Sequence, residues 1–410
     1  MRVRTLLAAA FLGLAGTLVP TVTASAAPAC ADPAAPLTVE EQRLALPATG
    51  EILRRSGFDR FERVFTPSLC LLPDNRAAKV AIGVQGRALW AAAVARAQGK
   101  LPPGTLPVTD DRPLYWARLQ LTKALRQWTP SFALSPGDRA ALIDVLERTS
   151  RGQDSIAYSR NALKILVTGF DPFQLDQDIR RSNPSGVNAL ALDGTVIQTA
   201  AGPARVETAM FPVLWDPFAE GMVERAILPW LGKVDMFTTI SQGRVGRFDV
   251  ERYNGRWRGG FPDNDNLSRT EVIPIPAGVP TVTPAPEFVP TTLPYAKIVA
   301  APTGRFPVYD NTSVTEIPAG QTAPVVSPTG PTPGSVARAG GGGNYLSNEI
   351  AYRATLLRDA LGLTIPGGHL HTPVLEFGQG NTTELTDPVF EQNQRDIVDQ
   401  IRAVLTVALS

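Results

Sequence analysis

The sequence predicts an α/β protein in two parts, a helical N-terminal domain followed by a mostly parallel sheet between two layers of helices. Residues 37–149 repeat a helical periodicity broken by Gly and Pro, with no convincing strand. From residue 164 onward, short apolar runs rich in β-branched residues alternate with helical stretches. Such alternation is typical of parallel strands covered on both faces, a three-layer α/β/α sandwich.

The N-terminus has the features of a secretory signal peptide, for which we expect residues 1–26. Arg2 and Arg4 precede an apolar run at 6–19, and small residues follow at 24–26. That run is too short to cross a bilayer of about 30 Å, and no later stretch is long enough, so we expect a secreted protein without a membrane span. A lipoprotein is the alternative, but the residues before Cys30 do not fit the pattern that lipidation requires.

The two cysteines, Cys30 and Cys70, both lie early in the mature chain. Because secretion exposes them to an oxidising compartment, we expect a disulfide between them. Closing a loop of about 40 residues would stabilise the fold by about 4 kcal/mol. Two buried free thiols are the alternative.

Residues 27–160 are interpreted as a helical accessory domain of unknown function. Its clearest helices are expected at 76–98, 114–128 and 136–149. The last begins with Ser135 as N-cap and Pro136 in the first turn. This part of the chain contains no histidine and assembles no reactive group.

The second domain is expected to cover residues 161–410. The first strand, residues 164–170, is apolar and ends in Gly-Phe, as a buried parallel strand does. Further strands are expected at 206–215, 234–241 and 369–377, and helices at 216–231, 348–361 and 388–409. A Pro-rich insertion at about 271–337 interrupts this pattern, since 14 of the 37 prolines lie between Pro274 and Pro333. Such a segment is either a functional lid or a partly ordered insertion.

The charge balance argues against two classes of partner. Lys and Arg number 39 and Asp and Glu number 38, which leaves a net charge of +1. No overall field therefore attracts the chain to nucleic acid or to an anionic membrane surface.

Three segments carry residues that could be reactive. His369 and His371 are the only histidines in the sequence. Residues two apart in a strand point to the same face, so the two imidazoles should lie side by side. They could be metal ligands, a catalytic base with its neighbour, or ordinary polar residues. A run of four glycines at 340–343 precedes Ser347, which is expected at the start of a helix. There it could be a nucleophile beside free backbone amides or a simple N-cap. Glu251 lies in a strand after a glycine turn, beside Arg252, where an ordinary surface ion pair would be the default.

Together, these segments resemble the pyroglutamyl-peptidase I family, cysteine peptidases that remove N-terminal pyroglutamate. The resemblance covers roughly residues 164–410. Its motifs are Thr-Gly-Phe-Asp-Pro-Phe at 168–173, Asn-Pro-Ser at 183–185, a Gln-Gly stretch at 241–247 leading to Glu251-Arg252, Phe-Pro-Asp-Asn at 261–264, and the segments around Ser347 and His371. Ser347 stands where the family has its nucleophilic cysteine.

The resemblance implies roles for these residues. His371 would be the base, Glu251 would orient it, and Ser347 would be the nucleophile. Phe170 and Phe173 would pack on the lactam ring, with Gln242 and Asn183 as further substrate-binding residues. The implied substrate is an N-terminally blocked peptide or a related small amide, no cofactor is implied, and the family forms small homo-oligomers, which the added helical domain could block.

Two departures from the family pattern keep a second interpretation open. Gly260 replaces an arginine that the family uses at its oxyanion site, and serine replaces cysteine. The alternative is therefore a catalytically inactive member that binds a blocked end-group. A metal site at His369 and His371 is a third possibility, for which the sequence offers no third ligand at suitable spacing.

Overall fold

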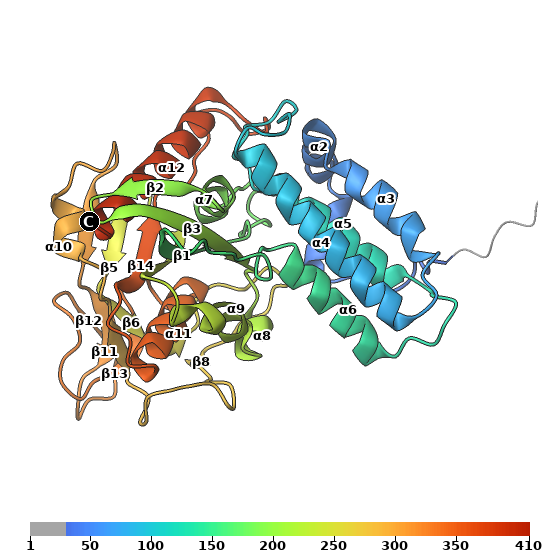
Figure 1. Ribbon diagram of the computed structural model, residues 1–410. Coiled ribbons are helices and arrows are strands. Elements are labelled where there is room, and N and C mark those ends of the chain that lie inside the picture. Colours follow the sequence, from blue (N-terminus) through green and yellow to red (C-terminus); the bar gives the residue numbers. More distant parts are fainter. Residues whose placement is uncertain (1–29) are drawn as a thin grey trace, which may run out of the picture.

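The structure is a computed structural model that describes residues 30–410, so the predicted signal peptide lies outside the described residues. A helical region and an α/β region lie side by side (Figure 1). The helical region comprises α1 (Val39–Gln42), η1 (Arg43–Ala45), α2 (Pro47–Ser56), α3 (Asp59–Leu69), α4 (Asn75–Ala97), α5 (Arg112–Gln127) and α6 (Pro136–Thr149). Within residues 30–410, no helix is both long and apolar enough to cross a membrane.

A seven-stranded sheet forms the centre of the α/β region, in the order β10-β5-β14-β4-β1-β3-β2. Four of its neighbouring pairs are parallel and two are antiparallel, namely β14 with β5 and β2 with β3. The strands are β1 (Leu163–Phe170), β2 (Val196–Thr199), β3 (Gly202–Phe211), β4 (Met236–Gln242), β5 (Phe248–Glu251), β10 (Val308–Asn311) and β14 (Gly367–Thr372).

Side chains that alternate along the strands bury the two faces of this sheet. Ile165 and Val167 of β1 pack into a core with α7 (Pro184–Leu192) and α12 (Pro388–Ala408). Leu166, between them, packs into the opposite core with α9 (Met222–Leu231) and α11 (Leu346–Ala360). Figure 1 shows these two helical layers on either side of the sheet. The predicted α/β/α sandwich is confirmed.

Several predicted elements differ in extent. The single helix expected at 216–231 is two helices, α8 (Trp215–Ala219) and α9, because Gly221 between them has a φ of 80°. The strand expected at 369–377 ends at Thr372, before Pro373, and the strand expected at 206–215 begins earlier and ends at Phe211.

The Pro-rich insertion is ordered. It contains the short strands β8 (Glu271–Val272), β9 (Phe288–Pro290), β11 (Val314–Ile317) and β12 (Val325–Ser327), the helix α10 (Tyr295–Ala300), and the start of β13 (Val336–Ala339). One of its strands, β10, extends the main sheet by pairing with β5.

The disulfide prediction is confirmed, since Cys30 and Cys70 are bonded, with 5.6 Å between their Cα atoms. Cys70 follows α3, and the backbone oxygen of Cys30 accepts a hydrogen bond from Thr129 after α5. The disulfide therefore ties Cys30, at the start of the described chain, to the end of α3 in the helical region.

A buried ion-pair network joins the two regions. Asp171 comes directly after β1, and its carboxylate accepts hydrogen bonds from Arg118 of α5 at 2.6 Å and from Arg151, just after α6, at 2.7 Å. None of these three side chains is more than 1% exposed. Arg151 also pairs with Glu147, but the buried Asp171 depends on the two arginines, so loss of either one would cost about 3–5 kcal/mol.

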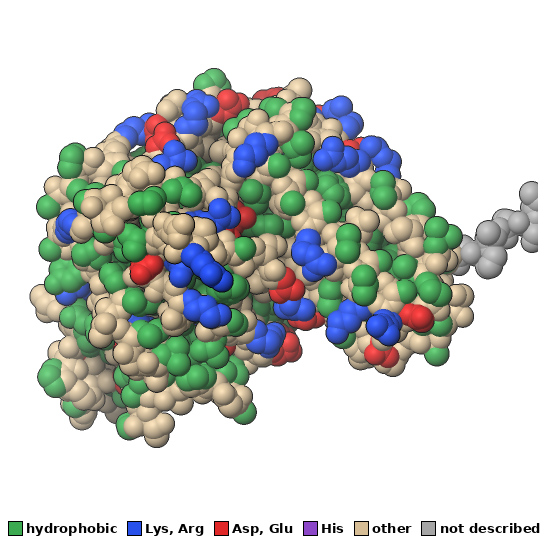
Figure 2. All heavy atoms as spheres, viewed as in Figure 1, with side chains coloured by type: hydrophobic (Ala, Val, Ile, Leu, Met, Phe, Trp, Pro, Cys, Tyr) green, Lys and Arg blue, Asp and Glu red, His purple; other side chains and the backbone are tan. Residues whose placement is uncertain are grey.

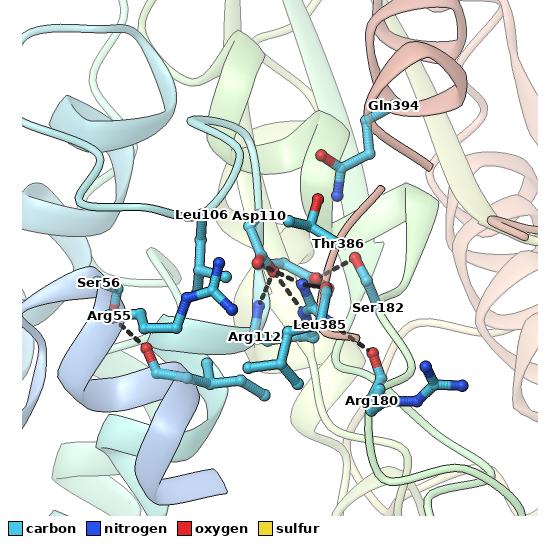
Figure 3. A network of polar contacts seen from close by, with 12 residues as sticks. Arg55, Ser56, Leu106, Asp110, Arg112, Arg180, Ser182, Leu385, Thr386 and Gln394 are labelled. Carbon is cyan, nitrogen blue, oxygen red and sulfur yellow. Dashed lines mark hydrogen bonds and ion pairs between the residues drawn. The ribbon is translucent and has the colours of Figure 1, made fainter. Parts of the chain in front are cut away.

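A third buried arginine, Arg112, binds two loops of the α/β region by their backbones (Figure 3). Arg112, at the start of α5, donates to the carbonyl oxygens of Arg180 and Leu385, both at 2.7 Å, and pairs with Asp110. Leu385 and other apolar residues of the α/β region also belong to the apolar core of the helical region, so the core is continuous across the junction.

Acidic and basic side chains are spread over the face of the molecule in Figure 2 among apolar ones.

Two buried acids complete the junction. Glu40 accepts hydrogen bonds from Tyr115 at 2.7 Å and Asn264 at 3.0 Å. Asp111 accepts from the Ser182 hydroxyl at 2.5 Å and from the Asn183 backbone at 3.0 Å. Burial raises the pKa of each carboxyl to about 8, with a neighbouring acid adding to the effect.

We expect the disulfide to contribute a large share of the stability. Replacing both Cys30 and Cys70 with serine should lower the free energy of unfolding by about 4 kcal/mol, because the unfolded chain regains the entropy of an open loop of about 40 residues. Urea unfolding of the oxidised protein and the double variant measures this difference. An unchanged midpoint would mean that the bond adds nothing to the fold.

We also expect the buried acids to make the protein less stable as the pH rises. The pKa of Glu40 and Asp111 is about 8 when folded and about 4 when unfolded, so between these values the folded state holds more protons. The free energy of unfolding therefore falls with rising pH, by at most about 1.4 kcal/mol per pH unit and group. Glu40→Gln and Asp111→Asn should gain stability relative to the native protein between pH 5 and pH 8.

Urea unfolding at several pH values tests this expectation. Glu51→Gln is the matched control, because Glu51 is a partly exposed glutamate on α2 that pairs with Arg54. If the two buried variants and the control show the same pH dependence as the native protein, Glu40 and Asp111 are not protonated in the folded state.

Candidate active site

The candidate residues come from chain segments that meet at one edge of the sheet. The parallel strands β1, β4 and β14 end at Phe170, Gln242 and Thr372, so their carboxyl ends lie together. The carboxyl edge of a parallel sheet is the usual place for ligands in α/β folds. The start of α11, which carries Ser347, lines the same cleft as His371 of β14.

His371 and Glu251 form a buried pair. The Nδ1 atom of His371 lies 2.7 Å from Oε1 of Glu251, and the exposed fractions of the two residues are 5% and 0%. An ionised carboxylate only accepts hydrogen bonds, so Nδ1 carries the hydrogen and Nε2 is left as the basic nitrogen. β14 pairs with β5 in antiparallel register with Glu251 opposite His369, so Glu251 lies diagonal to His371 on the same face of the sheet.

The glycine run lies against this pair. A Cβ on Gly341 would come within 2.3 Å of Oε2 of Glu251, and one on Gly342 within 2.7 Å of the His371 ring. Gly243 is restricted in the same way, by Cβ of His371 at 2.5 Å. Only glycine therefore allows the backbone to approach the imidazole and the carboxylate so closely.

Ser347 is the second residue of α11, and Tyr345 is the N-cap. The interpretation of Ser347 as the N-cap is therefore wrong. Its hydroxyl donates to the carbonyl oxygen of Gly342 at 3.3 Å. Ser347 and His371 line one cleft, but no hydrogen bond joins them here. The amide of Asn348 donates to the carbonyl oxygen of Tyr345 at 2.9 Å, so the groups at this helix start that could bind an anion are the amides of Leu346 and Ser347.

His369 has a different environment from His371. Its Nδ1 lies 2.7 Å from the Thr239 hydroxyl and its Nε2 lies 2.9 Å from the Ser241 hydroxyl. Complete burial, and secondarily the neighbouring His371, lower its pKa well below 6.5, so the ring is neutral. The two imidazoles make an edge-to-face contact with 4.6 Å between their centroids. Both nitrogens of His369 are thus engaged by hydroxyl groups, and residues 30–410 contain no cluster of three potential metal ligands.

One polar contact of this site was not anticipated from the sequence. Asn311, at the end of β10, donates to Oε2 of Glu251 at 2.7 Å and to the carbonyl oxygen of Gly341 at 2.9 Å. It lies in the Pro-rich insertion, far along the chain from both partners. No local pattern identifies it, because its position depends on the pairing of β10 with β5.

A small pocket lies beside Ser347, with a volume of about 30 Å³. Phe170, Phe173, Gln242 and Asn183 all line it, together with Ser347. Phe173 stacks on Tyr345, which also lines the pocket. The four substrate-binding residues predicted from the resemblance are therefore neighbours, and their role in binding stays a prediction.

Two of these four side chains also have structural contacts. The Asn183 side chain caps α7 by accepting from Ser185 and donates to the carbonyl oxygen of Asp171. Phe170 stacks on Phe218 in the core. Gln242, by contrast, lines both the pocket and the main cleft.

The pocket adjoins a cleft of about 750 Å³ that also contains Ser347 and His371. Its walls come from the loop after β1, the loop after β4, the glycine run and the segment after β14. The lining includes Gln174, Asp178, Arg180, Arg181, Arg244, Val245, Phe261, Val374, Glu376 and Phe377. A cleft of this size has room for several residues of a peptide.

Glycine stands at the sequence position where the resembled family has its oxyanion arginine. Gly260 has a φ of 95°, and a Cβ there would lie 2.9 Å from the Asn344 side chain. Arg258, close upstream, is buried and pairs with Glu271 at 2.6 Å and Glu349 at 3.3 Å. Its guanidinium is thus committed to two carboxylates.

Solved structures similar to this chain are peptidases. A pyrrolidone carboxyl peptidase mutant from the hyperthermophile Pyrococcus furiosus is 24% identical, with a TM-score of 0.40 over 60% of this chain and 98% of that one. Pyroglutamyl peptidase I from Bacillus amyloliquefaciens is 20% identical, with a TM-score of 0.40 over 60% of this chain and 97% of that one.

Family models match both parts of the chain. The PA0049 N-terminal domain matches residues 22–147, and the PA0049 C-terminal domain matches residues 164–291 and 304–376. The uncharacterized protein PA0049 of Pseudomonas aeruginosa PAO1 is 34% identical to this chain, over 88% of this chain and 84% of that protein. The chain therefore belongs to the PA0049 family.

Proposed function

We propose that this protein is a secreted hydrolase that removes N-terminal pyroglutamate, or a related small acyl group, through Ser347, His371 and Glu251. One observation carries the proposal: a buried His371–Glu251 pair with 2.7 Å between Nδ1 and Oε1 lines the same cleft as a serine at the start of a helix. A serine, a histidine and an acid in these roles are the components of acyl transfer by a nucleophilic hydroxyl.

The reaction follows from the roles of the three side chains. Nε2 of His371 takes the proton of Ser347 as Oγ bonds to the substrate carbonyl carbon. The bond from that carbon to the leaving nitrogen then breaks, and the amine departs with the proton from His371. Water next gives a proton to His371 and attacks the acyl group, and Ser347 recovers its proton as the ester bond breaks. Glu251 keeps the imidazole in the required tautomer and stabilises its protonated form.

The hydroxyl of Ser347 must turn for this chemistry. Its present hydrogen bond to Gly342 is 3.3 Å long, the length of a weak hydrogen bond, so little energy opposes a rotation toward His371. The oxyanion that forms would be stabilised by the first amides of α11. With Arg258 paired to two acids, we assign this task to the backbone.

The side chains around the small pocket suit a small, flat acyl group, for which the present volume of about 30 Å³ would have to widen. Phe170 and Phe173 offer aromatic surface, and Gln242 offers an amide for a polar edge of the ligand. The larger cleft beyond Ser347 would hold the rest of the peptide. These features match the N-terminally blocked peptide or small amide that the resemblance implies.

A second candidate function has one observation in its favour. Ser347 bonds to Gly342 and not to His371, which is what an inactive descendant would show. In that case the protein would bind a blocked end-group without hydrolysing it.

The Cys30–Cys70 disulfide supports secretion, because disulfides persist in oxidising compartments. Residues 27–160 would serve either activity as an accessory domain. The arginines and acids at the junction bind the loops after β1 and before α12. We propose that this domain holds the walls of the cleft in place.

Hydrolysis of a fluorogenic pyroglutamyl amide by the mature protein tests the proposal. We expect turnover by the native protein and a loss of about 10⁴-fold or more in kcat for both Ser347→Ala and His371→Ala. Ser68→Ala is the matched control, because Ser68 also donates to a backbone carbonyl but lies in α3. This control should retain full activity.

The remaining outcomes separate the two candidate functions. An inactive native protein that gains activity with Ser347→Cys would have kept its pocket and lost its nucleophile. Calorimetric binding of a pyroglutamyl peptide without turnover would then identify a binding protein. No turnover and no binding would contradict both candidates.

A further inference from the structure

The Pro-rich insertion places one strand directly beside the proposed catalytic acid. β10 runs parallel to β5, and Asn311 is the register partner of Glu251. Register partners in neighbouring strands point to the same face of a sheet. Asn311 therefore points toward the face that carries Glu251.

The Asn311 side chain has one orientation that satisfies all its groups. Nδ2 donates one hydrogen to Oε2 of Glu251 at 2.7 Å and the other to the carbonyl oxygen of Gly341 at 2.9 Å. Oδ1 accepts from the backbone of Ser313 at 3.3 Å. A flipped amide would direct Oδ1 toward two acceptors, so this network assigns the orientation.

Glu251 depends on this contact because it is completely buried. Its two carboxylate oxygens have one donor each, His371 on Oε1 and Asn311 on Oε2. An unsatisfied oxygen on a buried carboxylate is costly, so without Asn311 the group would be driven to rotate or to recruit water.

We propose that Asn311 is a positioning residue of the active site, an inference that rests on the proposed function. It fixes the rotation of Glu251 and links it to the glycine run at Gly341. That run continues through Gly342, which touches the His371 ring and accepts the hydroxyl hydrogen of Ser347. One amide thus connects the acid, the base and the nucleophile segment, and the insertion that supplies it completes the site.

Asn311→Asp is the sharpest test, since it keeps the size of the side chain and replaces the donor with an acceptor. We expect kcat on the pyroglutamyl amide to fall about 10- to 100-fold, the effect of losing a hydrogen bond to a charged group, while KM changes less than about threefold. Asn311→Ser, which keeps one donor, should lose less. Asp310→Asn is the control in the same strand, because Asp310 pairs with Arg252 near the surface.

Histidine NMR provides a readout that does not require activity. The chain has two histidines, so a protein labelled with ¹⁵N at histidine gives signals from His369 and His371 alone. Asn311→Asp should shift the signals of His371 and leave those of His369 in place. Because it sets a second carboxylate against the buried Glu251, it should also lower the thermal unfolding temperature. Should Asn311→Asp fail to fold, Asn311→Ser is measured in the same way.

The outcomes distinguish this inference from the proposed function. If the native protein proves inactive, the proposed function fails, while the shift of His371 still shows whether Asn311 positions the pair. Unchanged His371 signals together with unchanged kcat would overturn the inference. Equal shifts of both histidines would also overturn it, because they would indicate a general structural role.

Discussion

Asp171 is completely buried, and Arg118 and Arg151 of the helical region hold its carboxylate at 2.6 and 2.7 Å. The same turn carries Phe170 and Phe173, which line the pocket beside Ser347. The ion pairs thus fix the helical region and the pocket wall to one short segment. Because a buried charge without its partners is strongly unfavourable, the ion pairs favour the arrangement of this segment in which both arginines reach Asp171.

The site itself depends on close backbone approach and on strand order. Glycines at 341 and 342 leave space for the Glu251 carboxylate and the His371 ring. The register of β14 with β5 sets Glu251 opposite His369, so Glu251 and His371 face the same side of the sheet. Asn311 completes the set from a strand that the insertion adds at the sheet edge. The insertion that interrupts the α/β pattern in the sequence is therefore part of the proposed catalytic apparatus.

Local patterns predicted much of this architecture. The apolar run of β1 and the alternation of strands and helices were sufficient to predict the sandwich. The spacing of His369 and His371 was sufficient to predict that their side chains share one face of a strand. The break at Gly221 was missed because a single glycine within an apolar stretch gives little signal. Asn311 was missed for a different reason: its contacts arise from strand pairing over 60 positions, which short-range periodicity does not encode.

The central claim is that Ser347 forms a covalent bond to the substrate, and mass spectrometry of the reacting protein tests it most directly. The mature protein would be mixed with a pyroglutamyl ester, quenched in acid within the first turnovers and digested. The account predicts the mass of the acyl group on the peptide that contains Ser347, and its disappearance in Ser347→Ala. Rapid turnover of the ester with no acyl group on that peptide, or with equal turnover by Ser347→Ala, would contradict the account.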